Sequence, residues 1–121
     1  MSNAPTGFRD LTQGVSASLA SLRTSTPDVM KSFGELGRAS TAGGVLDRKT
    51  KELIALALRV AARCDPCIGF HMQTLVKLGA TRQEVDETLG VATYMGGGPS
   101  LMYAASAINA FKEFSRPTGG A

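Results

Sequence analysis

The sequence predicts an all-α fold, and two observations lead to this prediction. Apolar residues recur at helical spacing along most of the 121-residue chain, and no stretch alternates apolar and polar residues between turn signals as a strand would. Aromatic residues make up only 6% of the chain while alanine, leucine and glycine are abundant, a balance that suits closely packed helices. We expect about six helices in one domain covering residues 1–121, with residues 1–6 and 115–121 frayed.

The first half of the chain predicts two helices separated by a short break. Thr26 and Pro27 are expected to be the N-cap and first residue of the second helix, and T-A-G-G at residues 41–44 is a predicted loop. Each helix has one apolar face, formed by Phe8, Leu11, Val15, Leu19 and Leu22 in the first and by Met30, Phe33 and Leu36 in the second.

Asp47 is expected to cap a third helix that runs to about Arg63. Its later part, L-I-A-L-A-L-R-V-A-A, is apolar on most sides, which predicts the central buried helix. A fourth helix is predicted to have Asp65 as its N-cap and Pro66 as its first residue, and to end at Gly79. Folded back on the third helix, it would form a central antiparallel pair around the two cysteines.

T-R-Q-E at residues 81–84 is a capping box that predicts the start of a fifth helix, and the glycines at residues 96–98 are expected to end it. A phosphate loop would need a preceding strand, so these glycines favour a helix break with close packing. Pro99 opens the sixth helix. The expected inward residues are Val85, Leu89, Ala92 and Met95 in the fifth helix and Leu101, Met102, Ala105, Ile108 and Phe111 in the sixth.

Charge and hydropathy argue against two classes of partner. The net charge is +3, and basic and acidic residues are mixed without a basic stripe interleaved with aromatics, so we expect no nucleic-acid partner. The longest nearly uninterrupted apolar run is about ten residues, whereas a bilayer span needs roughly 20. No signal peptide is visible. We therefore expect a cytoplasmic protein without a membrane partner.

Both cysteines and the only histidine lie in the segment C-D-P-C-I-G-F-H, residues 64–71. Covalent haem attachment is disfavoured because histidine would have to follow the second cysteine directly. A structural zinc site usually needs four ligands, so a carboxylate would have to complete the set, and we expect no metal. A pair of inert, buried cysteines is another alternative.

A thiol redox centre fits this segment better. Cys67 would lie near the start of the fourth helix, where the helix dipole and free amides favour a thiolate. His71 follows one turn later on the same face and could donate a proton to a leaving group. The CxxC spacing allows a disulfide between Cys64 and Cys67.

Glu52 extends this segment to the pattern E-x11-C-x-x-C-x3-H. The pattern resembles the signature of the AhpD-like alkylhydroperoxidases within the carboxymuconolactone decarboxylase superfamily. The flanking stretches L-D-R-K-T-K-E-L-I-A-L-A and Y-M-G-G-G-P-S-L-M-Y-A are also similar, and the resemblance covers about residues 40–115. One departure is Pro66, where some members have a histidine that could join the proton relay.

The resemblance implies an all-helical subunit that forms homo-oligomers, typically hexamers built as trimers of dimers. It also implies a thiol-dependent peroxidase in which Cys67 attacks a hydroperoxide and Cys64 then closes a disulfide. Glu52 and His71 would form the proton relay, although helix geometry puts Glu52 about 18 Å along the axis from Cys64. No bound cofactor is implied. The reductant would be an external dithiol, such as a lipoyl group on a partner protein.

Three other functions stay open at this point. A general disulfide reductase or redox sensor would use the same residues without turning over peroxide. Decarboxylation of a muconolactone, the other activity of the superfamily, has no need of a redox cysteine pair. A helical assembly module with incidental cysteines would have no enzymatic activity.

Overall fold

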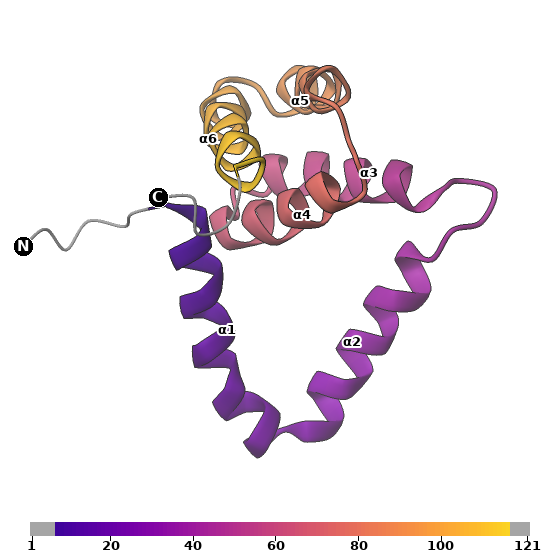
Figure 1. Cartoon of the computed structure of the whole chain (residues 1–121), viewed down its shortest axis with the longest axis vertical. Helices are drawn as coiled ribbons and strands as arrows, with labels where there is room; N and C mark the ends of the chain where they lie inside the picture. The colour runs from indigo at the N-terminus through magenta and orange to yellow at the C-terminus, as the bar shows by residue number, and fades with distance from the viewer. Residues whose placement is uncertain (1–6, 117–121) are drawn as a thin grey trace, which may run out of the picture.

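A computed structural model describes residues 7–116, and these residues form six α-helices and no strand (Figure 1). This confirms the predicted all-α class. The expected fraying of residues 1–6 and of the end of the chain falls mostly outside the described residues, and only Ser115 and Arg116 of the last segment are described. The helices are α1 (Phe8–Ser25), α2 (Pro27–Thr41), α3 (Arg48–Ala61), α4 (Asp65–Lys77), α5 (Arg82–Gly96) and α6 (Gly98–Phe114).

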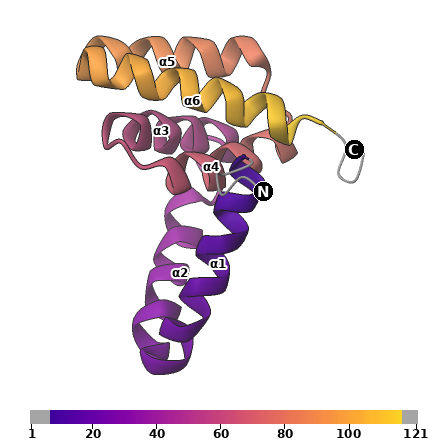
Figure 2. The same ribbon diagram turned by 90° about the vertical axis from the view of Figure 1, so that its left-hand side faces the viewer.

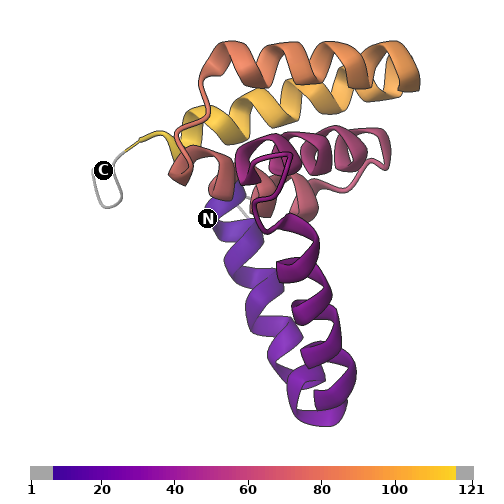
Figure 3. The ribbon, with the colours of Figure 1, turned by 90° about the vertical axis from the view of Figure 1, so that its right-hand side faces the viewer.

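Four helices form a body of two layers, and the other two form an arm. Figure 2 shows α5 and α6 in one layer and α3 and α4 in the next, with α1 and α2 extending away from the body. The arm helices meet at their junction and diverge from it toward the body (Figure 1), and they overlap in the views of Figures 2 and 3. Helices α3 and α4 run in opposite directions side by side, because only residues 62–64 connect them.

The core lies between the two layers of the body. Fully buried side chains come from α3, α4 and α5, and each adds roughly 1.5–3 kcal/mol of stabilisation relative to an exposed position. Small residues of α6 close the core from the other side. The fully buried apolar residues are Leu56, Val60, Ile68, Met72, Leu75, Val85, Ala107 and Ala110.

The predicted inner face of α6 was wrong for Leu101, Met102 and Ala105 and right for Ile108 and Phe111. Leu101 and Met102 are 50% and 63% exposed, and the buried residues are Ser100, Ala104, Ala107, Ala110 and Phe114. At the turn between α5 and α6, a Cβ on Gly96 would collide with the buried Ser100 side chain, so the two helices meet closely there. Ala105 is also exposed, while Ile108 and Phe111 are half-buried against the core.

The apolar faces of α2 and α3 also differ from the prediction. In α3, Leu56 and Val60 are buried, but Ile54 and Leu58 are 48% and 63% exposed, so the helix is buried on one side only. Helix α2 buries no residue against the described chain. Its outer face presents Val29, Phe33 and Leu36, and α5 presents Met95, which was expected in the core.

Two predicted helix starts are confirmed by their hydrogen bonds. The Asp47 carboxylate accepts from the Thr50 amide at 2.8 Å, and Thr81 and Glu84 form the reciprocal capping box. Thr26 occupies the predicted N-cap position of α2, but its hydroxyl donates to the Leu22 carbonyl of α1 instead of accepting from α2.

Helix α1 is attached to the body at its first turns. The Glu113 carboxylate of α6 accepts from the amides of Phe8 and Arg9 at 2.7 and 2.9 Å. One turn further along α1, Thr12 is buried against Gly69 of α4. A side chain at position 69 would not fit, so the glycine permits the close approach of α1 and α4.

Candidate functional site

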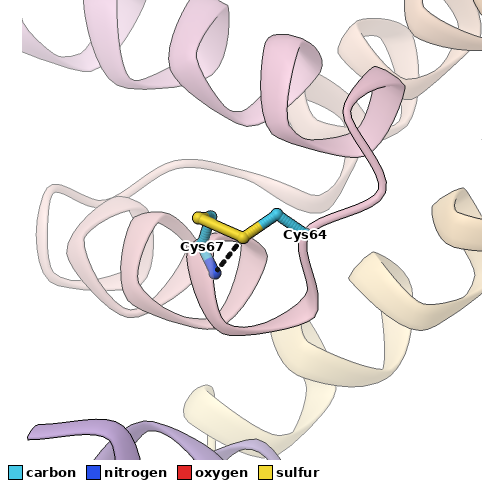
Figure 4. Close-up of a disulfide and its surroundings, with 2 residues drawn as sticks. All are labelled: Cys64 and Cys67. Atoms are coloured by element: carbon cyan, nitrogen blue, oxygen red, sulfur yellow. Dashed lines mark hydrogen bonds between the residues drawn. A yellow bond between two sulfur atoms is a disulfide. The ribbon is translucent and has the colours of Figure 1, made fainter.

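The two cysteines form a disulfide at the start of α4 (Figure 4). Their Cα atoms are 5.3 Å apart, within the usual range for a disulfide. Both residues are partly buried. The CxxC spacing, which allowed this bond, therefore brings the two sulfurs together within a single helical turn.

The start of α4 differs by one residue from the prediction. Cys64, not Asp65, is the N-cap, and its Sγ accepts a hydrogen bond from the Cys67 amide at 3.3 Å (Figure 4). Asp65 is the first helical residue and Pro66 the second, which a helix tolerates because the first amides have no intrahelical acceptor. The sulfur takes the place that an oxygen of Ser, Thr, Asp or Asn usually occupies.

Asp65 was considered only as a cap, and the structure gives it a different position. Its Oδ1 is buried, and it has no hydrogen-bond partner within residues 7–116. A buried carboxylate oxygen without a donor is unusual in a folded protein. Asp65 lies between Cys64 and Pro66 in the sequence, so this unsatisfied acceptor is part of the segment that the disulfide closes.

Glu52 of α3 and His71 of α4 are in direct contact. His71 Nδ1 donates to Glu52 Oε1 at 2.8 Å. The Glu52 side chain is 6% exposed and that of His71 is 28% exposed, so the carboxylate is inside and the imidazole extends toward solvent. Although Glu52 and Cys64 were expected to be far apart along the axis of α3, Glu52 reaches His71 because α4 lies beside α3 and runs back along it.

This contact determines how the imidazole can act. A carboxylate acceptor keeps the proton of a neutral imidazole on Nδ1, which leaves Nε2 free to accept a proton. When Nε2 is protonated, the buried negative charge of Glu52 stabilises the imidazolium. Within residues 7–116, His71 makes no direct hydrogen bond to either sulfur, and it lies one helical turn beyond Cys67.

All four predicted site residues thus lie on the central pair α3 and α4. The structure joins them as two units, a disulfide with its amide donor and a histidine with its carboxylate. The first unit can exchange two electrons, and the second can take up and release a proton. The roles of the individual residues in a reaction stay predictions.

Three other properties of the described chain bear on function. No group of three or more His, Cys, Asp or Glu side chains in residues 7–116 is arranged to hold a metal ion. None of the helices described is long and apolar enough to span a membrane. A groove of about 620 Å³ lies between α1, α4 and α6, and its lining includes Arg9, Phe70 and Lys77 but none of the four predicted site residues.

Comparison with known proteins identifies the relatives of this chain. The sequence pattern of the carboxymuconolactone decarboxylase family matches residues 27–110. An uncharacterized protein from Cupriavidus necator is 37% identical over 80% of this chain and 86% of its own length. An uncharacterized protein from Haemophilus influenzae is 40% identical over 56% of this chain and 60% of its own length.

Two solved structures of proteins from the same family are also similar to this chain. The crystal structure of a carboxymuconolactone decarboxylase family protein from Legionella pneumophila, in its apo form, superposes with a TM-score of 0.88. That protein is 59% identical and covers 90% of this chain and 97% of its own. A family protein from Thermotoga maritima, for which involvement in an antioxidative response has been suggested, superposes with a TM-score of 0.76. It is 30% identical and covers 84% of this chain and 87% of its own.

Proposed function

Because this chain belongs to the carboxymuconolactone decarboxylase family and joins a cysteine pair to a helix pair that carries Glu52 and His71, we propose that it is a thiol-dependent peroxidase that reduces alkyl hydroperoxides. The observation that carries the proposal is the presence of both units on α3 and α4. In a thiol-dependent reaction the sulfur pair supplies the two electrons that reduce the peroxide, and the histidine handles the proton. The antioxidative role suggested for the Thermotoga maritima relative is consistent with it.

In the oxidative half of the reaction, the Cys67 thiolate attacks the terminal oxygen of the hydroperoxide. The O–O bond breaks, Cys67 becomes a sulfenic acid, and the alkoxide takes a proton from His71 to leave as an alcohol. The Cys64 thiolate then attacks the sulfenic sulfur, forms the disulfide and releases hydroxide, which leaves as water after protonation. Glu52 acts as a positioning residue, because its carboxylate keeps the His71 ring in place through the hydrogen bond to Nδ1.

In the reductive half, an external dithiol returns two electrons to the disulfide. A lipoyl group on a partner protein has the chemistry for this step, because its two thiols can close into a ring after the exchange. No resident cofactor is required. We place this chemistry in the cytoplasm, where a single disulfide is more often catalytic than structural.

A general disulfide reductase or redox sensor would use the same cysteine pair, and it differs only in the oxidant. Muconolactone decarboxylation fits the site less well. The protein has one histidine, and that residue is held against Glu52 beside a disulfide that decarboxylation does not need.

We also propose that the protein is a homo-oligomer, with the hexameric assembly that the family resemblance implies. The support is the exposed apolar face of α2, formed by Val29, Phe33 and Leu36, which are 66%, 69% and 62% exposed. Helices of this length gain most of their stability from packing an apolar face, and α2 has none packed in the single chain. We expect Phe33→Glu to lower the molar mass measured by light scattering, and an unchanged mass would contradict this surface.

A thiol count tests the peroxidase proposal. The reduced protein is mixed with one equivalent of an alkyl hydroperoxide, and free thiols and alcohol are measured over time. We expect the rapid loss of two thiols with one alcohol formed, and no reaction in Cys67→Ser. Two thiols that persist in the wild type would refute the proposal.

Two further variants test the assigned roles in the same assay. We expect Cys64→Ser to react once and then remain as a sulfenic acid or overoxidise. His71→Gln should slow the loss of thiols without preventing disulfide formation. Loss of the first oxidation in Cys64→Ser but not in Cys67→Ser would reverse the roles of the two cysteines.

A further inference from the structure

The two sulfurs of the disulfide have different surroundings. Cys64 lies before the first turn of α4, and its Sγ accepts the Cys67 amide at 3.3 Å. Cys67 lies inside the first turn, and within the described residues its sulfur has no such donor. A backbone amide is already aimed at one of the two sulfurs while the bond between them is intact.

This difference matters when the disulfide is reduced. The attacking thiolate bonds to one sulfur, and the other sulfur departs with the electron pair of the broken bond. Exchange is faster when the departing sulfur is the better-stabilised thiolate. A donor at the start of a helix stabilises a thiolate both by its hydrogen bond and by the helix dipole.

We propose that the reducing thiol attacks Cys67, and that Cys64 departs as a thiolate held by the Cys67 amide. The inference rests on the proposed thiol–disulfide function but not on a hydroperoxide as the oxidant. It assigns the covalent intermediate with the reductant to Cys67. Cys64 is then a thiolate in both half-reactions. It departs from the disulfide in the reductive half, and it attacks the sulfenic acid of Cys67 in the oxidative half.

The step balances for a dithiol reductant. Its first thiolate forms a bond to Cys67 Sγ, the Cys64–Cys67 bond breaks, and the electron pair stays on Cys64. Its second thiolate attacks the reductant sulfur of the mixed disulfide, closes a ring and releases Cys67 as a thiolate. The dithiol loses two electrons and two protons, the disulfide gains two electrons, and the protons pass to solvent or to the released sulfurs.

His71 could favour the opposite direction, because a proton given to Cys67 would make that sulfur the better departing group. The structure favours the amide over the imidazole. The amide contact with Cys64 is formed in the disulfide state, whereas the protonated nitrogen of His71 donates to Glu52. Its other nitrogen makes no hydrogen bond to a sulfur within residues 7–116.

The experiment maps the mixed disulfide on the unmodified protein. The disulfide form is mixed with 2-mercaptoethanol and quenched at short times in mild acid with N-ethylmaleimide, which blocks the free cysteine. Trypsin then releases the peptide from Cys64 to Lys77, because cleavage follows Arg63 and Lys77. Fragmentation at the labile Asp65–Pro66 bond separates the two cysteines in the mass spectrometer.

We expect mercaptoethanol on Cys67 and maleimide on Cys64, in about tenfold excess over the reverse pattern at the earliest times. Equal labelling, or mercaptoethanol mainly on Cys64, would overturn the inference. An intact disulfide at every time would overturn it too, since the centre would not exchange with thiols.

Single-cysteine variants provide a second readout that does not depend on trapping. Cys67→Ser keeps the amide that faces Cys64, and Cys64→Ser leaves Cys67 inside the first turn. The ultraviolet absorbance of the thiolate should appear at lower pH for Cys64 than for Cys67, and the opposite order would contradict the inference. Neither measurement uses a hydroperoxide, so failure of the peroxidase assay and failure of this inference can be told apart.

Discussion

Replacing Gly69 by alanine tests how closely α1 approaches the helix that carries the cysteines. An added Cβ at this position would lie 2.7 Å from Thr12 Cγ2 and 3.1 Å from Phe8 Cδ1. Thr12 is only 4% exposed, so its methyl group has little room to move. The substitution therefore forces α1 away from α4 or strains both helices.

Two opposing terms set the expected magnitude. Alanine stabilises a helix interior by about 1 kcal/mol relative to glycine. Overpacking a buried contact costs about 1–3 kcal/mol. Gly69→Ala should therefore change the free energy of unfolding by a net destabilisation of about 0–2 kcal/mol. Gly90 in α5 is a matched control, because nothing lies within 4 Å of its added Cβ, and Gly90→Ala should be stabilising.

Urea unfolding of the two variants measures the difference, which we expect to be about 1–3 kcal/mol. Thr12→Ser removes the obstructing methyl group and keeps the hydroxyl that donates to the Arg9 carbonyl at 3.2 Å. Combined with Gly69→Ala, it should recover most of the loss. Equal stabilisation by alanine at positions 69 and 90, or no recovery with Thr12→Ser, would refute the reasoning.

Three other predictions concern the site and the body. Glu52→Gln should slow peroxide-dependent thiol loss about 100-fold, because an amide cannot hold the imidazole of His71 as the carboxylate does; an unchanged rate would exclude this role. Hydrogen bonds from the Thr81 amide and then from Lys49 hold the pKa of Glu84 below its ordinary value of 4.5, so its stabilisation is present above that pH and is lost as the pH falls through the lower folded value. The difference in melting temperature between wild type and Glu84→Gln should shrink on acidification, and a constant difference would contradict this linkage. Met72 is fully buried, and Met72→Ala should cost about 2–5 kcal/mol in urea unfolding, with a loss under 1 kcal/mol showing that the core collapses around it.

Helix starts could be predicted from the sequence because their signals are local. Asp47 and the capping box at Thr81 and Glu84 each satisfy amides within three residues, so neighbouring residues suffice to identify them. The N-cap of α4 was predicted wrongly because aspartate is a commoner N-cap residue than cysteine. Choosing between them required knowing that the cysteine sulfur turns back toward the Cys67 amide.

Helix faces were harder to predict because they depend on neighbours far away in sequence. Leu101 and Met102 are large and apolar, yet they are exposed on α6, while Ala104, Ala107, Ala110 and Phe114 of the same helix are buried. The exposed face of α3, with Ile54 and Leu58, cannot be told from a buried one by composition. Hydropathy shows that a side chain is apolar but does not show which protein surface covers it.

The residues of the candidate site were predicted by their pattern, but their contacts were not. Glu52 and His71 are 19 positions apart, and their direct hydrogen bond could not be predicted from the distance between Glu52 and Cys64 along the helix axis. The reach of two side chains between adjacent helices depends on the offset and rotation of those helices. Neither can be read from spacing alone.

The hydrogen bonds from Phe8 and Arg9 to Glu113 have a consequence for the order of folding. They link residues that are 105 and 104 positions apart, so these two amides of the first turn of α1 obtain their acceptor from the last helix. A growing chain on the ribosome exposes α1 long before Glu113 has been synthesised. Closing so long a loop carries an entropic cost that the other helix contacts must already have reduced. Capping of these two amides is therefore expected to be a late event, whereas the contact of Thr12 with Gly69 of α4 does not depend on the last helix.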